Sequence, residues 1–111
     1  YDKVLLSSDL SLSAEAAGDP MSRGIQQLSQ GAADQLYLAV RLAICDMVLP
    51  VEKHVPLILD DALVTFDDDR LRAALDYLLS ESKKRQILLF TCHDRERAYL
   101  QGRENVSVIR L

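Results

Sequence analysis

The chain has few of the residues on which several classes of protein depend. Its 111 residues include two cysteines, four glycines and no tryptophan, and aromatic residues make up 5%. Two cysteines are too few for the disulfide framework of a small secreted domain. No apolar stretch reaches the roughly 18 uncharged residues of a membrane-spanning helix, because Arg41 and Asp46 interrupt the longest one, residues 36–49. No signal-peptide pattern opens the sequence, so we expect a cytoplasmic protein that makes no contact with a membrane.

The basic residues do not form the pattern of a nucleic-acid-binding surface. The chain carries 13 Lys and Arg against 17 Asp and Glu, a net charge of −4, and its basic run is Lys83-Lys84-Arg85. Nucleic-acid-binding surfaces usually combine a basic stripe with aromatic side chains, which are scarce here. We interpret the run as the end of a helix, where positive charge interacts favourably with the helix dipole. If the intact protein contacts DNA, we do not expect this segment to supply most of the contact.

Apolar patterning predicts an α/β chain that forms one domain or part of one. Hydrophobic residues make up 49% of the sequence, which is enough for a buried core. At the N-terminus we predict two antiparallel strands, residues 3–8 and 10–16, followed by a break at Gly18-Asp19-Pro20 and a connector over 21–28.

The remaining residues alternate between helices and strands. We predict helices at 28–49, 68–82 and 94–101 and strands at 55–59, 86–91 and 105–111, with Pro50 ending the first helix. Because parallel strands need crossover connections, this order predicts a parallel sheet of three strands. The long helix carries an apolar stripe that consists of Leu36, Ala39, Val40, Ala43, Ile44 and Met47. Its other faces are also apolar, so we expect this helix to pack on more than one side.

Residues 28–35 form a candidate phosphate-binding turn at the start of the long helix. They read Leu28-Ser29-Gln30-Gly31-Ala32-Ala33-Asp34-Gln35, an LSxGxxxQ pattern. A Ser-x-Gly turn that opens a helix directs free backbone N–H groups, a hydroxyl and the positive end of the dipole at one place. Short Ser/Gly turns are common, so the octet becomes informative through the motifs that follow it.

Two predicted strands end in side chains suited to phosphate chemistry. The first reads Leu57-Ile58-Leu59-Asp60-Asp61, a Walker B pattern, and the second is followed by Cys92-His93. In open α/β sheets, ligands bind outside the carboxyl ends of the strands. Asp60 would hold Mg²⁺, mainly through water. Asp61 would lie where a base can orient or deprotonate an attacking water.

Together these elements resemble the C-terminal half of an ABC-type ATPase head. Residues 34–44, which begin with the last two residues of the octet, look like those of the SMC, RecN and bacterial break-repair ATPases, whose heads are split by a long coiled coil. In that group an N-terminal lobe carries the Walker A loop, and the C-terminal lobe carries the signature, Walker B, D-loop and switch histidine. No G-x-x-x-x-G-K-[ST] loop occurs in this sequence. The resemblance therefore implies that residues 1–111 are the parallel-sheet C-terminal lobe of a split P-loop ATPase head, with an N-terminal antiparallel strand pair. The Walker A lobe would lie on the same or a separate chain.

The resemblance also implies a role for each motif. Two heads would dimerise across two ATP molecules, and each signature would contact the ATP of the other head through Ser29, Gln30, Gly31 and Gln35. His93 would be the switch histidine near the γ-phosphate, and Asp67 would belong to the D-loop at the dimer interface. ATP hydrolysis with Mg²⁺ would then control coiled coils, DNA or a nuclease in DNA repair or chromosome maintenance. Asp61 stands in place of the family's catalytic glutamate and is one methylene shorter, which predicts slow turnover.

Other interpretations remain open at this stage. A non-hydrolysing head would use ATP only as a bridge, and the aspartate at position 61 motivates that alternative. A Mg²⁺-dependent nuclease or phosphotransfer domain would use the carboxylates of Asp60, Asp61, Asp67 and Asp69, but it leaves the octet unexplained. Asp67, Asp68 or Asp69 could instead cap the second helix. The adjacent Cys92 and His93 lack the second pair of ligands that zinc sites usually have.

Overall fold

A small antiparallel sheet forms the N-terminal part of the computed structural model, which describes residues 3–9, 11–19 and 21–111. β1 (Lys3–Leu6), β2 (Leu12–Glu15) and β3 (Arg23–Gly24) lie in that order, with Lys3 opposite Glu15 and Ser13 opposite Gly24. The predicted strand pair is confirmed over these residues. β3 is an addition, because it comes from the segment predicted as a connector. Residues 10 and 20, inside the predicted second strand and the predicted break, lie outside the described residues.

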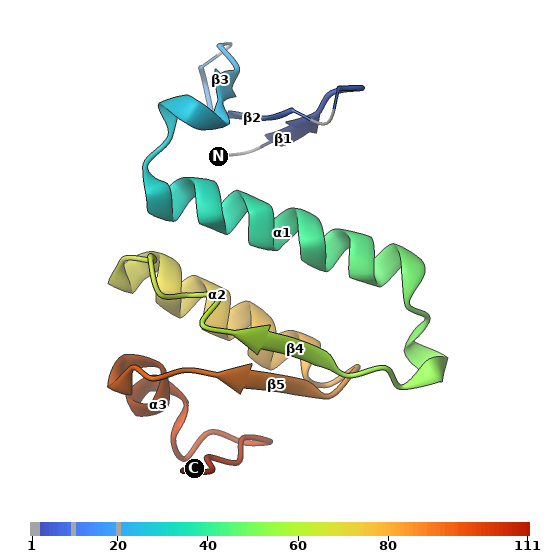
Figure 1. The fold of residues 1–111 in the computed structure, drawn as a ribbon, viewed down its shortest axis with the longest axis vertical. Coiled ribbons are helices and arrows are strands. Elements are labelled where there is room, and N and C mark those ends of the chain that lie inside the picture. The colour runs from blue at the N-terminus through green and yellow to red at the C-terminus, as the bar shows by residue number, and fades with distance from the viewer. Residues whose placement is uncertain (1–2, 10, 20) are drawn as a thin grey trace.

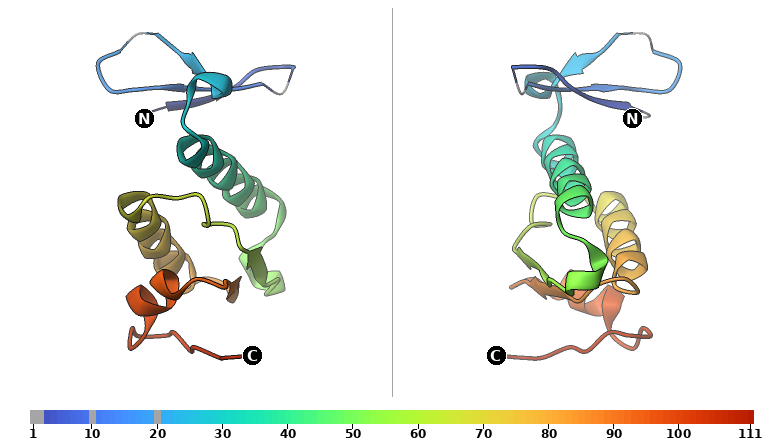
Figure 2. Two further views of the ribbon diagram at one scale, coloured as in Figure 1. Left: turned by 60° about the vertical axis from the view of Figure 1, so that its left-hand side comes forward. Right: turned by 90° about the vertical axis from the view of Figure 1, so that its right-hand side faces the viewer.

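A long helix, α1 (Gln30–Val48), follows the short 3-10 turn η1 (Ile25–Gln27). It lies between the N-terminal sheet and the layer that holds the second sheet (Figures 1 and 2). The helix is capped by Leu49 and followed by Pro50 and the turn η2 (Val51–Lys53). Proline has no N–H to continue the ladder, so the helix ends where the sequence predicts. No helix among the described residues is long and apolar enough to cross a membrane.

The second sheet consists of two parallel strands joined by a helical crossover. β4 (Leu57–Asp60) pairs with β5 (Ile87–Phe90), with Leu57 opposite Ile87 and Asp60 opposite Phe90. The crossover contains α2 (Asp68–Glu81), and α3 (Asp94–Leu100) follows β5. Both strands therefore end at the same edge of the sheet, the end to which their arrows point in Figure 1.

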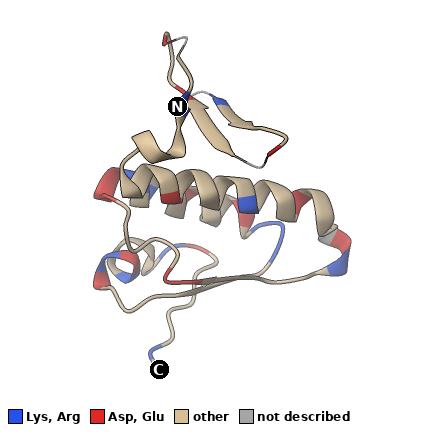
Figure 3. Ribbon diagram, turned by 45° about the horizontal axis from the view of Figure 1, so that its top comes forward, with Lys and Arg blue, Asp and Glu red and all other residues tan. Residues whose placement is uncertain are grey.

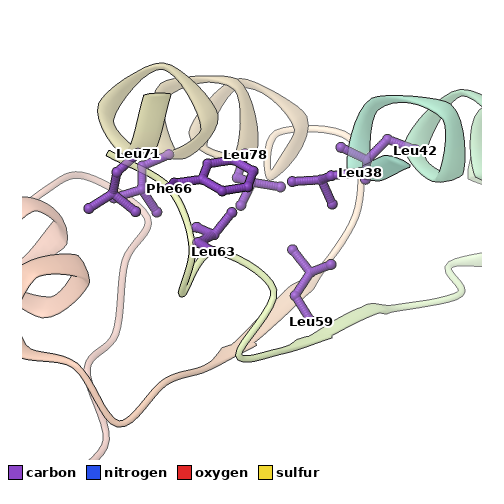
Figure 4. Packing of buried hydrophobic residues seen from close by; sticks show 8 residues of the cluster. Leu38, Leu42, Leu59, Leu63, Phe66, Leu71 and Leu78 are labelled. Atoms are coloured by element: carbon purple, nitrogen blue, oxygen red, sulfur yellow. The ribbon is translucent and has the colours of Figure 1, made fainter. Parts of the chain in front are cut away.

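The apolar core lies between α1, α2, the parallel sheet and the loop after β4 (Figure 4). The loop contributes Leu63 and Phe66, whose side chains are nearly inaccessible to solvent. α2 contributes three buried leucines, of which Leu75 is fully buried. The buried cluster consists of Leu38, Leu42, Leu59, Leu63, Phe66, Leu71, Leu75 and Leu78.

The face of α1 that reaches this core is not the predicted apolar stripe, of which Leu36 is buried. Leu38 and Leu42 are buried in the cluster, whereas Ile44 and Met47 of the predicted stripe are 51% and 86% exposed. Successive helical residues are rotated by about 100°, so a stripe that contains Leu38 lies well round the helix from one that contains Ala39. Because α1 is apolar on several sides, its sequence could not identify the face that contacts α2 and the sheet.

Residues 105–111 do not form the predicted third parallel strand. These residues follow α3 as an irregular segment (Figure 2). Ile109 within this segment is 80% exposed. Val106, Val108 and Ile109 favour extended structure, but a strand forms only by pairing with another strand. In the described residues this segment has no strand beside it, so the prediction is wrong there.

The basic run follows α2 and does not lie in its last turn. Lys84 lies 3.5 Å from Glu81, and the buried side chain of Arg85 pairs at 2.6 Å with Asp46 of α1. Ion pairs, one of them to another helix, therefore account for these two residues in place of the predicted interaction with the helix dipole. Lys and Arg elsewhere are distributed over helices, strands and loops (Figure 3).

Candidate functional site

Ser29 begins α1 as its N-cap. Its Oγ accepts a hydrogen bond from the Ala32 amide at 3.2 Å, and its carbonyl accepts one from the Ala33 amide at 2.9 Å. This is the geometry that places a helix N-terminus at a serine. The side chains of Ser29 and Gln30 are exposed, so the helix start faces solvent as the octet predicts. The side-chain amide of Gln30 also donates to the Asp34 carboxylate at 2.9 Å.

Gly31 has a packing role that the sequence did not reveal. It is buried, and a Cβ at this position would lie 2.8 Å from the carbonyl oxygen of Thr65. The Thr65 hydroxyl donates to Asp34 at 2.5 Å, so the loop after β4 is held directly against the first turns of α1. Only glycine lets the two backbones approach this closely. The residue predicted to contact a phosphate therefore also joins the octet to the loop that begins at Asp61.

Asp60 and Asp61 lie at the carboxyl end of β4, and both are exposed. The Asp61 amide donates to the carbonyl of Phe90 at 2.9 Å, which extends the parallel pairing by one residue. Asp61 itself has a φ of 48°, in the left-handed region. Aspartate is among the non-glycine residues that adopt this region most readily. Here the chain turns out of the sheet, and the Asp61 carboxylate is left at its edge.

His93 follows β5 at the same edge and is the N-cap residue of α3. Its amide donates to the Thr91 hydroxyl at 3.0 Å, and its side chain makes no capping hydrogen bond. One ligand atom from each of Asp61, Cys92 and His93 lies within 4.8 Å of the others. The structure thus brings together Asp61 and His93, the two predicted catalytic residues.

Cys92 is a member of this group that the sequence analysis gave little weight. Its Sγ lies 3.8 Å from both carboxylate oxygens of Asp61. The signal that could have identified it is its position directly before His93, beyond the end of a strand parallel to β4. Thiolate, imidazole and carboxylate suit a softer cation such as Zn²⁺, whereas Mg²⁺ prefers oxygen ligands and retains several waters. Asp60, which precedes Asp61 in the sequence, is an exposed oxygen donor of the kind that Mg²⁺ prefers.

Of the four acidic residues of the nuclease alternative, Asp61 belongs to this group, and the structure does not add Asp60, Asp67 or Asp69 to it. Among the described residues, the cluster of three or more ligand side chains consists of Asp61, Cys92 and His93. Asp67 caps α2, and Asp69 in its first turn pairs with Arg72 at 3.9 Å. Local roles at the helix start therefore account for these two carboxylates.

Arg70 connects the predicted D-loop residue to the octet. The Asp67 side chain accepts a hydrogen bond from the Arg70 amide at 2.8 Å and forms an ion pair with its guanidinium. The Arg70 Nε donates to the Gln35 side chain at 3.1 Å. The amide hydrogen bond, with the guanidinium beside it, lowers the pKa of Asp67 below its ordinary 3.8. Sequence analysis missed Arg70, although an arginine three residues after an N-cap aspartate is placed to pair with it.

Comparisons with known proteins identify a fold. No protein-family model matches the sequence. A stretch of 70 residues is 44% identical to the uncharacterized protein YhaN of Bacillus subtilis (strain 168). This stretch covers 62% of this chain and 7% of the length of YhaN. One solved structure is similar to 94% of this chain, with 21% identity and a TM-score of 0.71, and the similarity covers 68% of the chain in that structure. It is described as "Structural biochemistry of ATP-driven dimerization and DNA stimulated activation of SMC ATPases". This chain therefore has a mixed α/β fold similar to that of an SMC ATPase.

Proposed function

We propose that this chain is the signature-bearing lobe of an SMC-type ATPase head, in which ATP binding joins two heads and hydrolysis releases them. The observation that carries the proposal is the convergence of Asp61 and His93 at the carboxyl edge of the β4–β5 sheet. The similarity of the fold to an SMC ATPase, described by its ATP-driven dimerization, supports it. A Walker A lobe on the same or a separate chain completes the head. DNA repair or chromosome maintenance in the cytoplasm is the setting we propose.

The start of α1 would bind the γ-phosphate of the ATP held by the other head. The first N–H groups of a helix have no acceptor within the helix, and the dipole there favours an anion. The Ser29 hydroxyl accepts from the Ala32 amide, which leaves its own proton available to a phosphate oxygen. These contacts form only when the heads meet. ATP would therefore favour the closed dimer through contacts that the open state lacks.

The sheet edge would act on the ATP of its own head. The exposed carboxylate of Asp61 would accept the proton of the attacking water while the bond from the γ-phosphorus to the leaving oxygen breaks. His93 would donate a hydrogen bond to the γ-phosphate. Asp60 is an exposed oxygen donor, as the preferences of Mg²⁺ require, and Mg²⁺ held there would neutralise phosphate charge.

A non-hydrolysing head is the second candidate, and one contact favours it. The Cys92 thiol lies 3.8 Å from both oxygens of the Asp61 carboxylate, within reach of a sulfur hydrogen bond. A carboxylate whose oxygens are engaged by the thiol is less free to accept the proton of a water. In that case ATP would bridge two heads without turnover, and replacing Cys92 with alanine would increase the rate of hydrolysis.

The test is the mass in solution of the complete protein with both lobes, measured with and without ATP and Mg²⁺. Asp61→Asn keeps a residue that tolerates the left-handed backbone and removes the base, so ATP should persist and the dimer should accumulate. We expect the mass to double with ATP in this variant. Ser29→Arg places a bulky side chain at the phosphate-binding surface and should abolish the doubling while ATP still binds the single head.

One control separates this effect from simple damage, and a milder variant grades it. Ser80→Arg adds the same side chain at an exposed position near the end of α2, and it should still dimerise with ATP. Ser29→Ala removes the proposed phosphate-binding hydroxyl without adding bulk, so it should weaken ATP-driven dimerisation less than Ser29→Arg. A mass that is indifferent to ATP in Asp61→Asn, or doubling that survives in Ser29→Arg, would reject the assignment.

A further inference from the structure

Arg95 makes three hydrogen bonds to the loop that follows β4. It lies in the first turn of α3, two residues after His93. Its Nη1 donates to the carbonyl of Phe66 at 2.7 Å, and its Nη2 donates to the carbonyls of Leu63 and Val64 at 2.9 and 3.1 Å. Loop carbonyls have no partners from a helix or sheet ladder, so a side chain that binds three of them fixes the loop's path. A planar guanidinium is suited to this because its donors point in fixed directions.

Two carboxylates hold the guanidinium in place. Asp68, at the start of α2, lies 3.7 Å from Arg95, and the nearly inaccessible Glu96 lies 3.8 Å away. Arg95 itself is about one third exposed. The charge of its head group strengthens the bonds to the carbonyls, since charge-assisted hydrogen bonds are stronger than neutral ones. The guanidinium thus joins α3, the loop and the start of α2.

The loop that Arg95 holds carries two of the candidate site residues, Asp61 and Asp67. It begins at Asp61 and ends at Asp67, and its Thr65 carbonyl lies against Gly31. His93 lies just before Arg95 on the other side of the site. Leu63 and Phe66 anchor the loop in the core, while Arg95 binds the carbonyls of these two residues from outside it.

We infer that Arg95 is a positioning residue that couples the segment bearing His93 to the loop bearing Asp61 and Asp67, so that both sides of the site move together. The inference rests on the proposed ATPase function for its catalytic consequence. Its mechanical part concerns only the hydrogen bonds between α3 and the loop. The general expectation is that misplacing catalytic groups lowers the rate of chemistry far more than it weakens binding made by other groups.

The experiment compares Arg95→Ala and Arg95→Lys with Arg97→Ala in the complete protein. Arg97 is the matched control, because its guanidinium bonds to Asp94 and Gln101, on or next to its own helix. Amide hydrogen exchange of residues 61–67 measures the loop, and residues 71–79 of α2 serve as the internal reference. The kcat and KM for ATP measure the site.

In Arg95→Ala we expect exchange of the loop to rise by about tenfold or more relative to α2, and kcat to fall by about tenfold with KM changed less than about twofold. Lysine offers one compact donor group, so loop exchange and kcat in Arg95→Lys should lie between those of Arg95→Ala and those of the unmodified protein. Arg97→Ala should match the unmodified protein in both measurements.

Each other outcome has a distinct meaning. Unchanged loop exchange in Arg95→Ala would overturn the inference, as would raised exchange with an unchanged kcat. If the unmodified protein neither hydrolyses ATP nor dimerises with it, the proposed function fails, and loop exchange alone then decides whether Arg95 holds the loop. If Arg95→Ala unfolds, the graded comparison between Arg95→Lys and Arg97→Ala replaces it.

Discussion

Gly31 in the first turn of α1 lies directly against the backbone of Thr65, whose carbonyl oxygen would be 2.8 Å from a Cβ at position 31. We predict that Gly31→Ala destabilises the protein by about 1–3 kcal/mol, because a backbone carbonyl cannot move aside cheaply. The sign is informative, since alanine is otherwise favoured over glycine within a helix by about 1 kcal/mol. Denaturant unfolding measures the difference.

Gly24→Ala is the control for this variant. Gly24 has a φ of −63°, and a Cβ there would meet no atom within 4 Å. The free energy of unfolding of Gly24→Ala should stay within about 0.5 kcal/mol of that of the parent protein. A Gly31→Ala protein as stable as Gly24→Ala would show that the two backbones are farther apart than described.

Ser29 has a capping role that can be separated from its proposed phosphate contact. Its Oγ accepts from the Ala32 amide at 3.2 Å. Ser29→Ala should lose about 1 kcal/mol of stability, whereas Ser29→Asn, which caps equally well, should lose little. Thermal unfolding without nucleotide tests this. Equal losses in both variants would mean that the cap contributes nothing.

Asp67 gives stability a dependence on pH. The Arg70 amide hydrogen bond and the nearby guanidinium lower its pKa below 3.8 in the folded state. A carboxyl with a lowered folded-state pKa stabilises the fold above its unfolded-state pKa, and that contribution is lost as the pH falls through the folded-state value. Asp67→Ala should therefore be less stable than the parent at pH 7, with a gap that narrows below about pH 4.

Asp69→Ala supplies the comparison for the pH series. The Asp69 side chain is 98% exposed, and its contact with Arg72 is 3.9 Å long. We expect the unfolding midpoint of Asp69→Ala to follow that of the parent protein at every pH of the series. If the gap for Asp67→Ala were the same at pH 7 and pH 3, the ionised cap would not be its cause.

Leu75 tests the core between α2 and the sheet. Its side chain is fully buried in the apolar cluster. Leu75→Ala should cost about 2–5 kcal/mol through lost contacts and a cavity. Leu75→Met nearly conserves volume and should cost less than about 1.5 kcal/mol. Chemical denaturation of both variants measures these losses. If Leu75→Ala lost no more stability than Leu75→Met, the placement of Leu75 in the core would be contradicted.

The sequence predicted the elements that depend on local chemistry. Ser29 marks the start of α1 and Pro50 its end, because capping and the missing N–H act within one turn. The apolar runs that became β4 and β5 were recognised as strands because they are too short for helices, and the helical pattern between them predicted parallel pairing. That order also placed Asp61 and His93 at one edge, since parallel strands end on the same side.

Tertiary structure decided whatever depends on neighbours. The face of α1 in the core, the irregular path of residues 105–111 and the close approach of Gly31 to Thr65 are set by segments distant in sequence. The contact of Arg95 with the loop joins residues about 30 positions apart. Hydrogen bonds of this kind leave no periodic pattern, whereas a cap, a proline or a strand end is written in adjacent residues. Local rules thus determined the three long segments that became helices, the strand pairs β1–β2 and β4–β5 and the edge where the candidate residues meet, because these depend on adjacent residues. Packing between distant segments determined the remaining strand pairing and how the candidate residues are held.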